Sequence, residues 1–247
     1  MYHFFVEPEQ IGEHEIQITG GDVNHIRNVL RMTAGEQISV SSGENATQYR
    51  CEITELAPEY VTAKIMWAQE ADTELPAKIF LFQGLPKNDK MELIIQKAVE
   101  LGAYEIIPMA TKRAVVKLDK KKEESKRKRW NAISESAAKQ SKRMIVPQIK
   151  EVMTFSQAVS YAQKVCTKRI IPYEMAEGIG ETKRIFSEIG AGDCVAVFIG
   201  PEGGFDEKEI ELAKEAGIAP VTLGRRILRT ETAGMTVLSI LMFCLEK

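Results

Sequence analysis

The first 72 residues alternate short apolar and polar runs, which is the pattern of half-buried β-strands. It predicts four strands, at Glu15–Thr19, Gln37–Ser41, Thr47–Leu56 and Tyr60–Trp67. Ser42 to Asn45 is predicted to form a hairpin turn. Between the first two strands, Asp22–Arg31 is predicted to be a short helix with Asp22 as its N-cap. These elements predict a small barrel-like domain over residues 1–72.

After residue 72 the pattern changes to apolar runs that alternate with helical periodicity, which is typical of an α/β domain with a mainly parallel sheet. The predicted strands are Lys78–Gln83, Tyr104–Met109, Arg169–Tyr173, Cys194–Ile199 and Pro220–Leu223. The predicted helices are Asn88–Leu101, Asp206–Ala216 and Met235–Leu245. The last is apolar almost all round, so we expect it to be buried or to lie at a dimer interface. Residues 73–247 are thus expected to form a second domain.

Composition narrows the class of protein. The chain has 247 residues, of which 44% are hydrophobic, so it can bury a core without disulfides or metals. Its apolar runs are shorter than the ~20 residues of a membrane span, and its first residues lack the features of a signal peptide. The four cysteines are scattered with no C-x-x-C pair, which disfavours a zinc site and favours a reducing compartment. We therefore expect a cytoplasmic protein without membrane or metal partners.

The net charge of −2 conceals a strong asymmetry. Residues 73–150 carry 18 basic and 9 acidic side chains, whereas residues 1–72 carry 4 and 12 and residues 151–247 carry 11 and 14. Most of the positive charge lies between Lys112 and Lys150. The concentration indicates a polyanionic partner. A solvated helix face with Glu/Lys pairs is the alternative explanation.

Several common catalytic motifs are absent from the sequence. No G-x-G-x-x-G follows a strand, and there is no G-x-x-x-x-G-K-[ST] phosphate loop and no metal-ligand spacing. All three histidines lie within the first 25 residues, so a Ser-His-Asp hydrolase on the α/β domain lacks its base. The α/β domain must therefore use backbone groups, arginines and carboxylates.

Two loops carry the chemistry that remains. In residues 195–206 an apolar strand runs into a turn with three glycines and a proline, where backbone groups can approach a ligand at the strand's carboxyl end. A tight connection that needs positive φ is the alternative. In residues 223–234, three arginines and Glu231 lie beside a surface expected to be buried. There the alternative is a structural ion pair of Glu231 with Arg226 or Arg229. Together the two loops favour one shared pocket.

The chain resembles a known enzyme family in three strings and their order. Behind a small N-terminal segment with NHIRNVLRM come GLPKNDKMELIIQKAVELG, FIGPEGGFDEKEI and LGRRILRTETAG. They are similar to the 16S ribosomal RNA uridine-N3 methyltransferases of the SPOUT superfamily, and the resemblance covers nearly the whole chain. It implies an N-terminal PUA-like β-barrel and a C-terminal α/β domain with a trefoil knot. It also implies a homodimer that binds S-adenosylmethionine in the knot loops and acts on the small ribosomal subunit.

Carried onto this sequence, the resemblance implies a cofactor site made of Tyr173, Glu174, Ile199, Gly200, Pro201, Glu202, Gly203, Gly204, Leu223, Gly224, Leu228, Arg229 and Thr230. Arg229 is the candidate for stabilising a uracil that becomes anionic as its N3 proton leaves. Glu231, or less favourably Glu202, is expected to act as general base or to orient Arg229, with orientation the preferred role.

The residues expected to contact RNA phosphates are Arg27, Arg31, Lys87, Lys112, Arg113, Lys139 and Arg143. Two other functions remain open at this point. One is a non-catalytic RNA-binding or ribosome-assembly module. The other is a SPOUT enzyme that methylates transfer RNA, including at the 2′-oxygen of a ribose.

Overall fold

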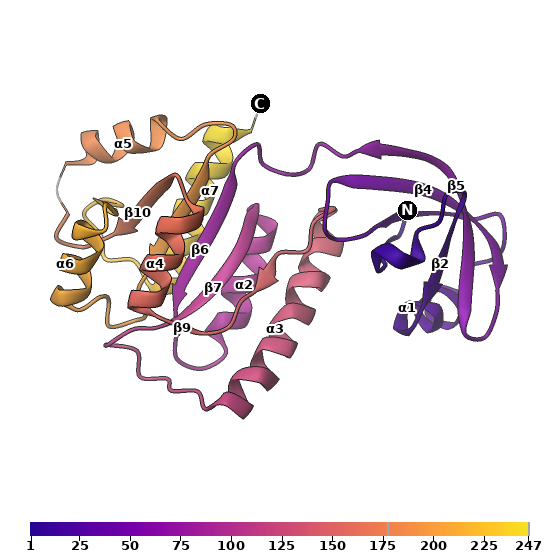
Figure 1. Ribbon diagram of the computed structural model, residues 1–247, viewed down its shortest axis with the longest axis horizontal. Coiled ribbons are helices and arrows are strands. Elements are labelled where there is room, and N and C mark those ends of the chain that lie inside the picture. Colours follow the sequence, from indigo (N-terminus) through magenta and orange to yellow (C-terminus); the bar gives the residue numbers. More distant parts are fainter. Residues whose placement is uncertain (177, 247) are drawn as a thin grey trace. The chain divides into compact units, whose positions relative to one another are not determined.

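The computed structural model describes residues 1–176 and 178–246, which form two compact units. Unit 1 comprises Met1–Glu74 and Ala138–Val146, and unit 2 comprises Leu75–Ala137 and Pro147–Lys247. Unit 1 is built on a curled five-stranded sheet of order β1-β3-β4-β5-β2 (Figure 1). Its strands are β1 (His3–Phe5), β2 (Glu15–Thr19), β3 (Gln37–Ser41), β4 (Thr47–Leu56) and β5 (Tyr60–Glu70). The four predicted strands are confirmed.

The helical part of unit 1 differs from its prediction. A short helix α1 (Gly21–Asn24) continues into a π-helical turn η2 (His25–Val29), and a 3-10 turn η1 (Pro8–Gln10) precedes β2. The N-cap of α1 is Gly20, at φ +75°, so the prediction that Asp22 caps the helix is wrong. The Gly20–Gly21 pair lets the chain turn before Asp22 is reached. The Asp22 carboxylate instead forms an ion pair with Lys139 at 3.2 Å.

His3 is held neutral inside unit 1. Its Nδ1 lies 2.9 Å from Ser39 Oγ and its Nε2 lies 3.0 Å from Ser41 Oγ. Burial, and secondarily the nearby Lys139 ammonium, lowers the pKa of His3 from 6.5 to about 4. The unfolded chain therefore binds a proton at pH values where the folded chain does not. The free energy of unfolding consequently falls as the pH is lowered from 6.5 to 4.

A His3→Gln variant is expected to lose this acid sensitivity. In the native protein the neutral His3 accounts for a drop of about 3 kcal/mol in the unfolding free energy between pH 6.5 and 4. Urea denaturation in a Trp130→Phe background, where Trp67 alone reports on unit 1, measures the drop at both pH values. An equal drop with and without His3 would contradict the assignment.

Unit 2 contains a parallel sheet of order β12-β10-β11-β6-β7-β8, with β9 also pairing with β7. Its strands are β6 (Lys78–Gly84), β7 (Ala103–Ala110), β8 (Gln148–Ile149), β9 (Met153–Thr154), β10 (Lys168–Pro172), β11 (Cys194–Ile199) and β12 (Ala219–Val221). The central strand β11 pairs with β6 and β10. It is almost wholly buried, which explains why its sequence is an unbroken apolar run.

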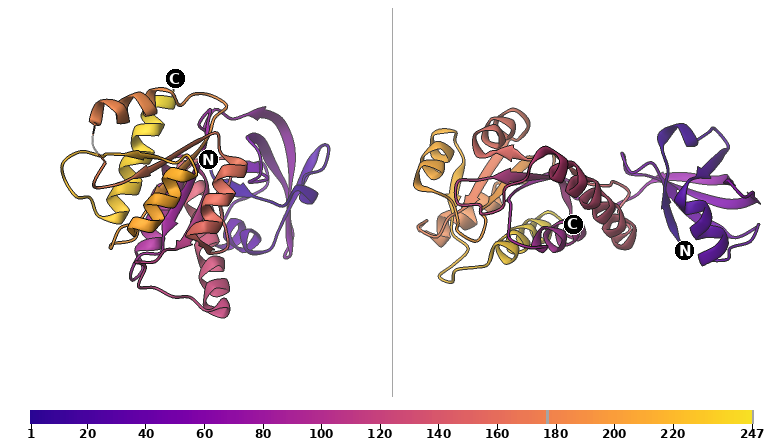
Figure 2. Two further views of the ribbon diagram at one scale, coloured as in Figure 1. Left: turned by 60° about the vertical axis from the view of Figure 1, so that its left-hand side comes forward. Right: turned by 90° about the horizontal axis from the view of Figure 1, so that it is seen from below.

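Helices cover both faces of this sheet (Figure 2). They are α2 (Lys90–Glu100), α3 (Lys120–Ser141), α4 (Phe155–Val165), α5 (Ile179–Ser187), α6 (Glu207–Glu215) and α7 (Thr230–Leu245). On one face, apolar residues of α4 and α6 share a core with the sheet, in which the Phe82 and Phe198 rings stack at 4.5 Å. On the other face α2 and α7 pack together, and α7 contacts β11. The central strands are therefore covered by α4 and α6 on one face and by α2 and α7 on the other.

The sequence predicts these elements well. The α/β class of unit 2 and the small, mainly β N-terminal unit are confirmed. The helix predicted from Asp206 is α6, which begins at a capping box of Asp206 and Glu209. Helix α7 begins five residues earlier than predicted, at Thr230. The trefoil knot stays a prediction. Within the described residues, no helix has the length and apolarity that a membrane crossing needs.

Candidate functional site

A cavity of about 970 Å³ opens in unit 2 at the carboxyl ends of β10, β11 and β12. All thirteen residues expected at a cofactor site line it, namely Tyr173, Glu174, Ile199, Gly200, Pro201, Glu202, Gly203, Gly204, Leu223, Gly224, Leu228, Arg229 and Thr230. Lining residues that the prediction missed include Lys90, Gly178, Thr222 and Ala233. The carboxyl ends of parallel strands are the usual place for ligands in such sheets.

The loops after β11 and β12 do not follow neighbouring strands, because β10 lies between those two strands in the sheet. The loop after β10 therefore completes the cavity between the other two. Its backbone is fixed by a hydrogen bond from the Tyr173 N–H to the Val221 carbonyl, at 3.0 Å. This loop has no motif of its own, so only the sheet order explains why it belongs to the site.

Two glycines at the cavity, Gly200 in the loop after β11 and Gly84 at the end of β6, leave no room for a side chain. A Cβ on Gly200 would lie 3.1 Å from the backbone of Gly204, which is itself at φ +66°. A Cβ on Gly84, the last residue of β6, would lie 2.6 Å from Pro201 Cδ. Glycine at these positions lets the end of β6 and the loop approach each other directly.

A buried hydrogen-bond relay joins three elements beneath the cavity. Gln83, fully buried at the end of β6, donates from Nε2 to Thr230 Oγ1 at 2.8 Å. Thr230 Oγ1 in turn donates to the Gly200 carbonyl at 2.6 Å. The first residue of α7 is thus tied to both β6 and the glycine-rich loop. The sequence offered one signal for Gln83, a single amide at the end of an apolar strand.

Two carboxylates and one ammonium meet at the edge of the cavity. Lys90 Nζ lies 3.2 Å from Glu202 Oε1 and 3.3 Å from Glu231 Oε2. Glu202 also accepts a hydrogen bond from the backbone N–H of Lys87, at 3.1 Å. The alternative explanation of the second loop, an ion pair of Glu231 with Arg226 or Arg229, is therefore not what the structure has. Glu231 pairs with Lys90, a residue without a predicted role.

The charge states of this cluster follow from its contacts. Burial disfavours the charged form of Glu202, but hydrogen bonds from its own N–H, from Lys90 and from the Lys87 N–H outweigh it and lower its pKa. The hydrogen bond to Glu202 raises the pKa of Lys90 against the opposing effect of burial, with support from the charge of Glu231. Lys90 stays an ammonium and Glu202 a carboxylate at neutral pH.

Arg229 is the N-cap residue of α7 and is exposed at the cavity. Its guanidinium forms no ion pair with any residue of the ranges 1–176 and 178–246. A cation that is not neutralised within the protein is available for an anionic ligand. Arg225 and Arg226 are also exposed and line the same cavity.

The residues expected to contact RNA divide into two groups. Arg31 and Lys87 are exposed and Arg27 is half-buried, so their side chains can reach a polyanion. The other four have partners within their own unit. Lys112 donates to Asp206, Arg113 to the Gly203 carbonyl, Lys139 to Asp22 and Arg143 to Glu74.

Arg143 is the clearest departure from the expectation. The residue is only 3% exposed, and its guanidinium holds the Glu74 carboxylate through Nε and Nη2. A buried charge pair of this kind is costly to break, so Arg143 stabilises unit 1 and is not available to a phosphate. Arg143 was predicted to contact RNA because it lies in a sequence segment rich in basic residues. Burial separates it from the exposed lysines of the same run.

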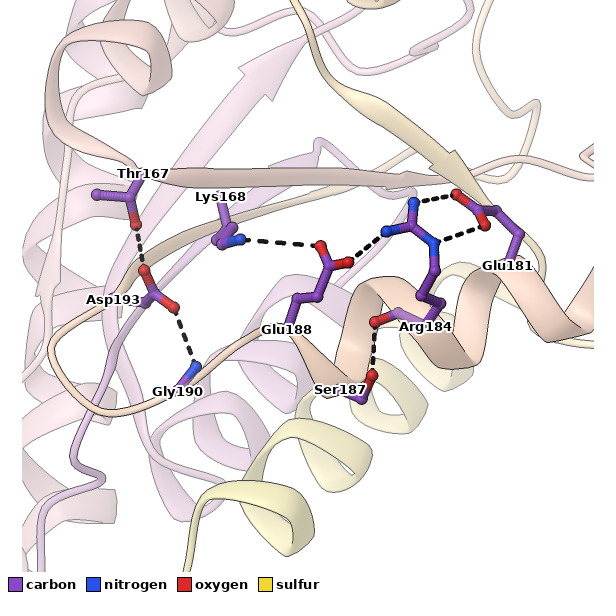
Figure 3. Close-up of polar contacts among 8 residues, drawn as sticks. All are labelled: Thr167, Lys168, Glu181, Arg184, Ser187, Glu188, Gly190 and Asp193. Carbon is purple, nitrogen blue, oxygen red and sulfur yellow. Dashed lines mark hydrogen bonds and ion pairs between the residues drawn. The ribbon is translucent and has the colours of Figure 1, made fainter.

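A surface network stabilises α5 beside the cavity (Figure 3). Arg184 pairs with Glu181 and Glu188 on the same helix, and Glu188 also lies near Lys168. Asp193 accepts hydrogen bonds from Thr167 and from the Gly190 N–H. The pairs of Arg184 lie within α5, and of these ion pairs only that of Glu188 with Lys168 links the helix to a neighbouring strand, β10.

Family models match both units. An RNA methyltransferase domain model matches residues 73–242, and an RNA methyltransferase PUA domain model matches residues 18–66. A relative from Bacillus subtilis (strain 168), named ribosomal RNA small subunit methyltransferase E, is 39% identical over 100% of this chain and 98% of its own length. These matches confirm the family resemblance seen in the sequence.

Solved structures give the same result. A ribosomal RNA small subunit methyltransferase E from Neisseria gonorrhoeae, bound to S-adenosylmethionine, is 30% identical with a TM-score of 0.83, over 98% of this chain and 97% of that one. A Legionella pneumophila protein in complex with the same cofactor is 32% identical with a TM-score of 0.83, over 98% and 96%. Both similarities extend over the two units of this chain.

Proposed function

This chain belongs to the RNA methyltransferase family that includes the ribosomal RNA small subunit methyltransferases E, and from that premise we propose its reaction. It transfers a methyl group from S-adenosylmethionine to N3 of a uridine in 16S ribosomal RNA. The observation that carries the proposal is the cavity at the carboxyl ends of β10, β11 and β12, which is lined by a glycine-rich loop and by exposed arginines. A ribosomal substrate places the enzyme in the cytoplasm.

The cavity suits S-adenosylmethionine in size and chemistry. Its volume of about 970 Å³ is within the range of roughly 300–1,000 Å³ typical of small-molecule sites. Glycines 200, 203 and 204 expose backbone groups that can bind the adenine and ribose, and Leu223 and Leu228 add apolar surface. When bound, the cofactor supplies an electrophilic methyl group on a sulfonium.

Methyl transfer to uracil N3 requires the nitrogen to lose its proton, so negative charge develops on the uracil carbonyl oxygens. Arg229 stabilises that charge, because its guanidinium is exposed at the cavity and offers two parallel donors. Holding the base in line with the methyl group supplies the rest of the rate enhancement.

Neither glutamate is well placed to accept the N3 proton. Glu202 is a poor proton acceptor, because hydrogen bonds from Lys90 and the Lys87 N–H lower its pKa. Glu231 is not among the described residues that line the cavity, and its Oε2 is buried and lies 3.3 Å from Lys90 Nζ. We therefore assign Glu231 the role of orienting the cations at the cavity edge and not that of general base.

RNA binding uses exposed cations of the segment between Lys112 and Lys150, where most of the positive charge lies. The exposed lysines of α3 are Lys120, Lys121, Lys122 and Lys128. Arg31 and Lys87 are exposed cations elsewhere in the chain. Each phosphate neutralised by such a side chain releases counterions, so the affinity for RNA falls as salt concentration rises.

The experiment that tests the proposed function is incubation of the protein with labelled S-adenosylmethionine and small subunits from cells lacking this methylation. The label is expected at N3 of one 16S uridine. Label on a ribose 2′-oxygen or on transfer RNA supports a different SPOUT activity. Failure to bind the cofactor in calorimetry supports a non-catalytic RNA-binding module.

We further propose that α7 pairs with a second copy of the chain. Phe243 is 83% exposed and Ile240 38% exposed on α7, and Leu93 is exposed on the adjacent α2. A Phe243→Lys variant is expected to sediment as a monomer, because a charge on this apolar face opposes burial. Val115→Lys, which changes a loop residue that is 70% exposed, is expected to leave the dimer intact. A dimeric Phe243→Lys protein would exclude this interface.

A further inference from the structure

We propose that Lys90 is a positioning residue that sets the distance between two walls of the cofactor cavity, an inference that rests on the proposed function. Lys90 stands at the first position of α2, and its ammonium bridges Glu202 in the glycine-rich loop and Glu231 in the first turn of α7. The two carboxylates belong to walls that come from separate parts of the sequence. Among the described residues, Lys90 is the one cation that both of them contact.

The bridge is partly withdrawn from water. The side chains of Lys90, Glu202 and Glu231 are 26%, 28% and 16% exposed. Interactions between partly buried charges such as these are stronger than those between fully exposed charges, because the effective dielectric constant is lower. Both carboxylate oxygens lie within 3.3 Å of the same ammonium, so without it they repel each other across a short gap.

Each carboxylate is coupled to residues that face the ligand. Glu202 lines the cavity itself and is held from the other side by the Lys87 N–H. Glu231 follows Arg229 and Thr230, which both line the cavity. In the absence of Lys90, repulsion between the two carboxylates therefore moves the glycine-rich loop away from the start of α7. The relay from Gln83 through Thr230 to Gly200 joins the same two walls from below.

The structure also explains why Lys90 is better suited than a neutral residue. The substrate is a polyanion, and two uncompensated carboxylates at the cavity edge repel it. With Lys90 in place the cluster carries a net charge of −1, whereas without it the charge is −2. Lys90 thus maintains the cavity shape and limits the negative potential that RNA meets.

The test compares Lys90→Met with Lys90→Arg and with the control Lys97→Met. The control removes the same charge from the same helix at a residue that pairs only with Glu100 among described residues. At pH 8, Lys90→Met is expected to bind S-adenosylmethionine at least about 10-fold more weakly in calorimetry, since a charge pair has lost one partner. Lys90→Arg is expected to restore the affinity, and the control to match the native protein.

The pH dependence of cofactor affinity in Lys90→Met distinguishes loss of the Lys90 charge from loss of the packing of its side chain. Lowering the pH to 5.5 protonates one of the two repelling carboxylates in Lys90→Met, so its affinity is expected to recover toward the native value. A defect of equal size at both pH values would overturn the proposal, because lost packing does not depend on proton binding. Native affinity in Lys90→Met at pH 8 would overturn it as well.

Hydrogen exchange tests the positioning independently of any ligand. In Lys90→Met, amides of residues 199–205 and 229–234 are expected to exchange faster at pH 8, with no change in Lys97→Met. Unchanged exchange in both segments would refute the role of Lys90. If the native protein binds cofactor but methylates no ribosomal RNA, the proposed function fails. The positioning role is then still decided by these binding and exchange measurements.

Discussion

Replacing Arg229 by alanine is expected to lower kcat for methyl transfer by about 100- to 1,000-fold, which is the usual cost of removing one donor that stabilises transition-state charge. Arg229 is exposed at the cavity, and within the described ranges no carboxylate neutralises it. The cofactor dissociation constant is expected to change far less than kcat, because the charge on the uracil develops only as the N3 proton leaves.

Single-turnover methylation of small subunits, combined with calorimetry for the cofactor, measures the two effects separately. Arg229→Lys is expected to recover only part of the activity, since an ammonium lacks the two parallel donors of a guanidinium. Arg184→Ala serves as the control, because it removes an arginine from the α5 network without touching the cavity lining. A native rate in Arg229→Ala would remove Arg229 from the mechanism.

Replacing Gly84 by alanine is expected to weaken S-adenosylmethionine binding by about 100-fold. The added Cβ would lie 2.6 Å from Pro201 Cδ and 2.7 Å from Pro201 N, which is too close for any real contact. The obstacle is backbone and a rigid ring, so the glycine-rich loop has to move. Overpacking of this kind costs about 1–3 kcal/mol, and here the displaced loop is a wall of the cavity.

The control for Gly84→Ala is Gly190→Ala, since a Cβ on Gly190 meets no atom within 4 Å. Calorimetry gives the cofactor affinity, and thermal unfolding shows whether each variant is folded. We expect Gly190→Ala to bind like the native protein. Native affinity in a folded Gly84→Ala protein would show that the loop tolerates displacement and that its fit against β6 is not required.

The elements of the fold could be predicted because most of them obey local rules. The strand Cys194–Ile199 is an apolar run buried on both faces, and α6 has a capping box at its start and a glycine after its end. The N-cap of the helix after Thr19 was assigned wrongly, because Gly20 and Gly21, rather than Asp22, determine where it begins. Glycine conformation depends on the neighbouring chain and cannot be deduced from residue type alone.

The candidate site was predictable only in part. The loops after β11 and β12 have distinctive residues, so their lining positions could be named in advance. Lys90 and Gln83 could not, because each acts through partners more than 100 positions away. The same limit explains why Arg143 was wrongly predicted to contact RNA. Its burial against Glu74 depends on tertiary packing and cannot be deduced from the basic residues around it in the sequence.

The relay beneath the cavity also constrains how the protein is made. Gln83 and Thr230 are 147 positions apart, so the hydrogen bond between them forms only after nearly the whole of unit 2 has been synthesised. Contacts of such sequence separation are slow to form, because a long loop must close before they contribute. A nascent chain that ends before Thr230 lacks this relay and the wall of the cavity at the start of α7. That wall is therefore completed only after all the strands of unit 2 have been synthesised.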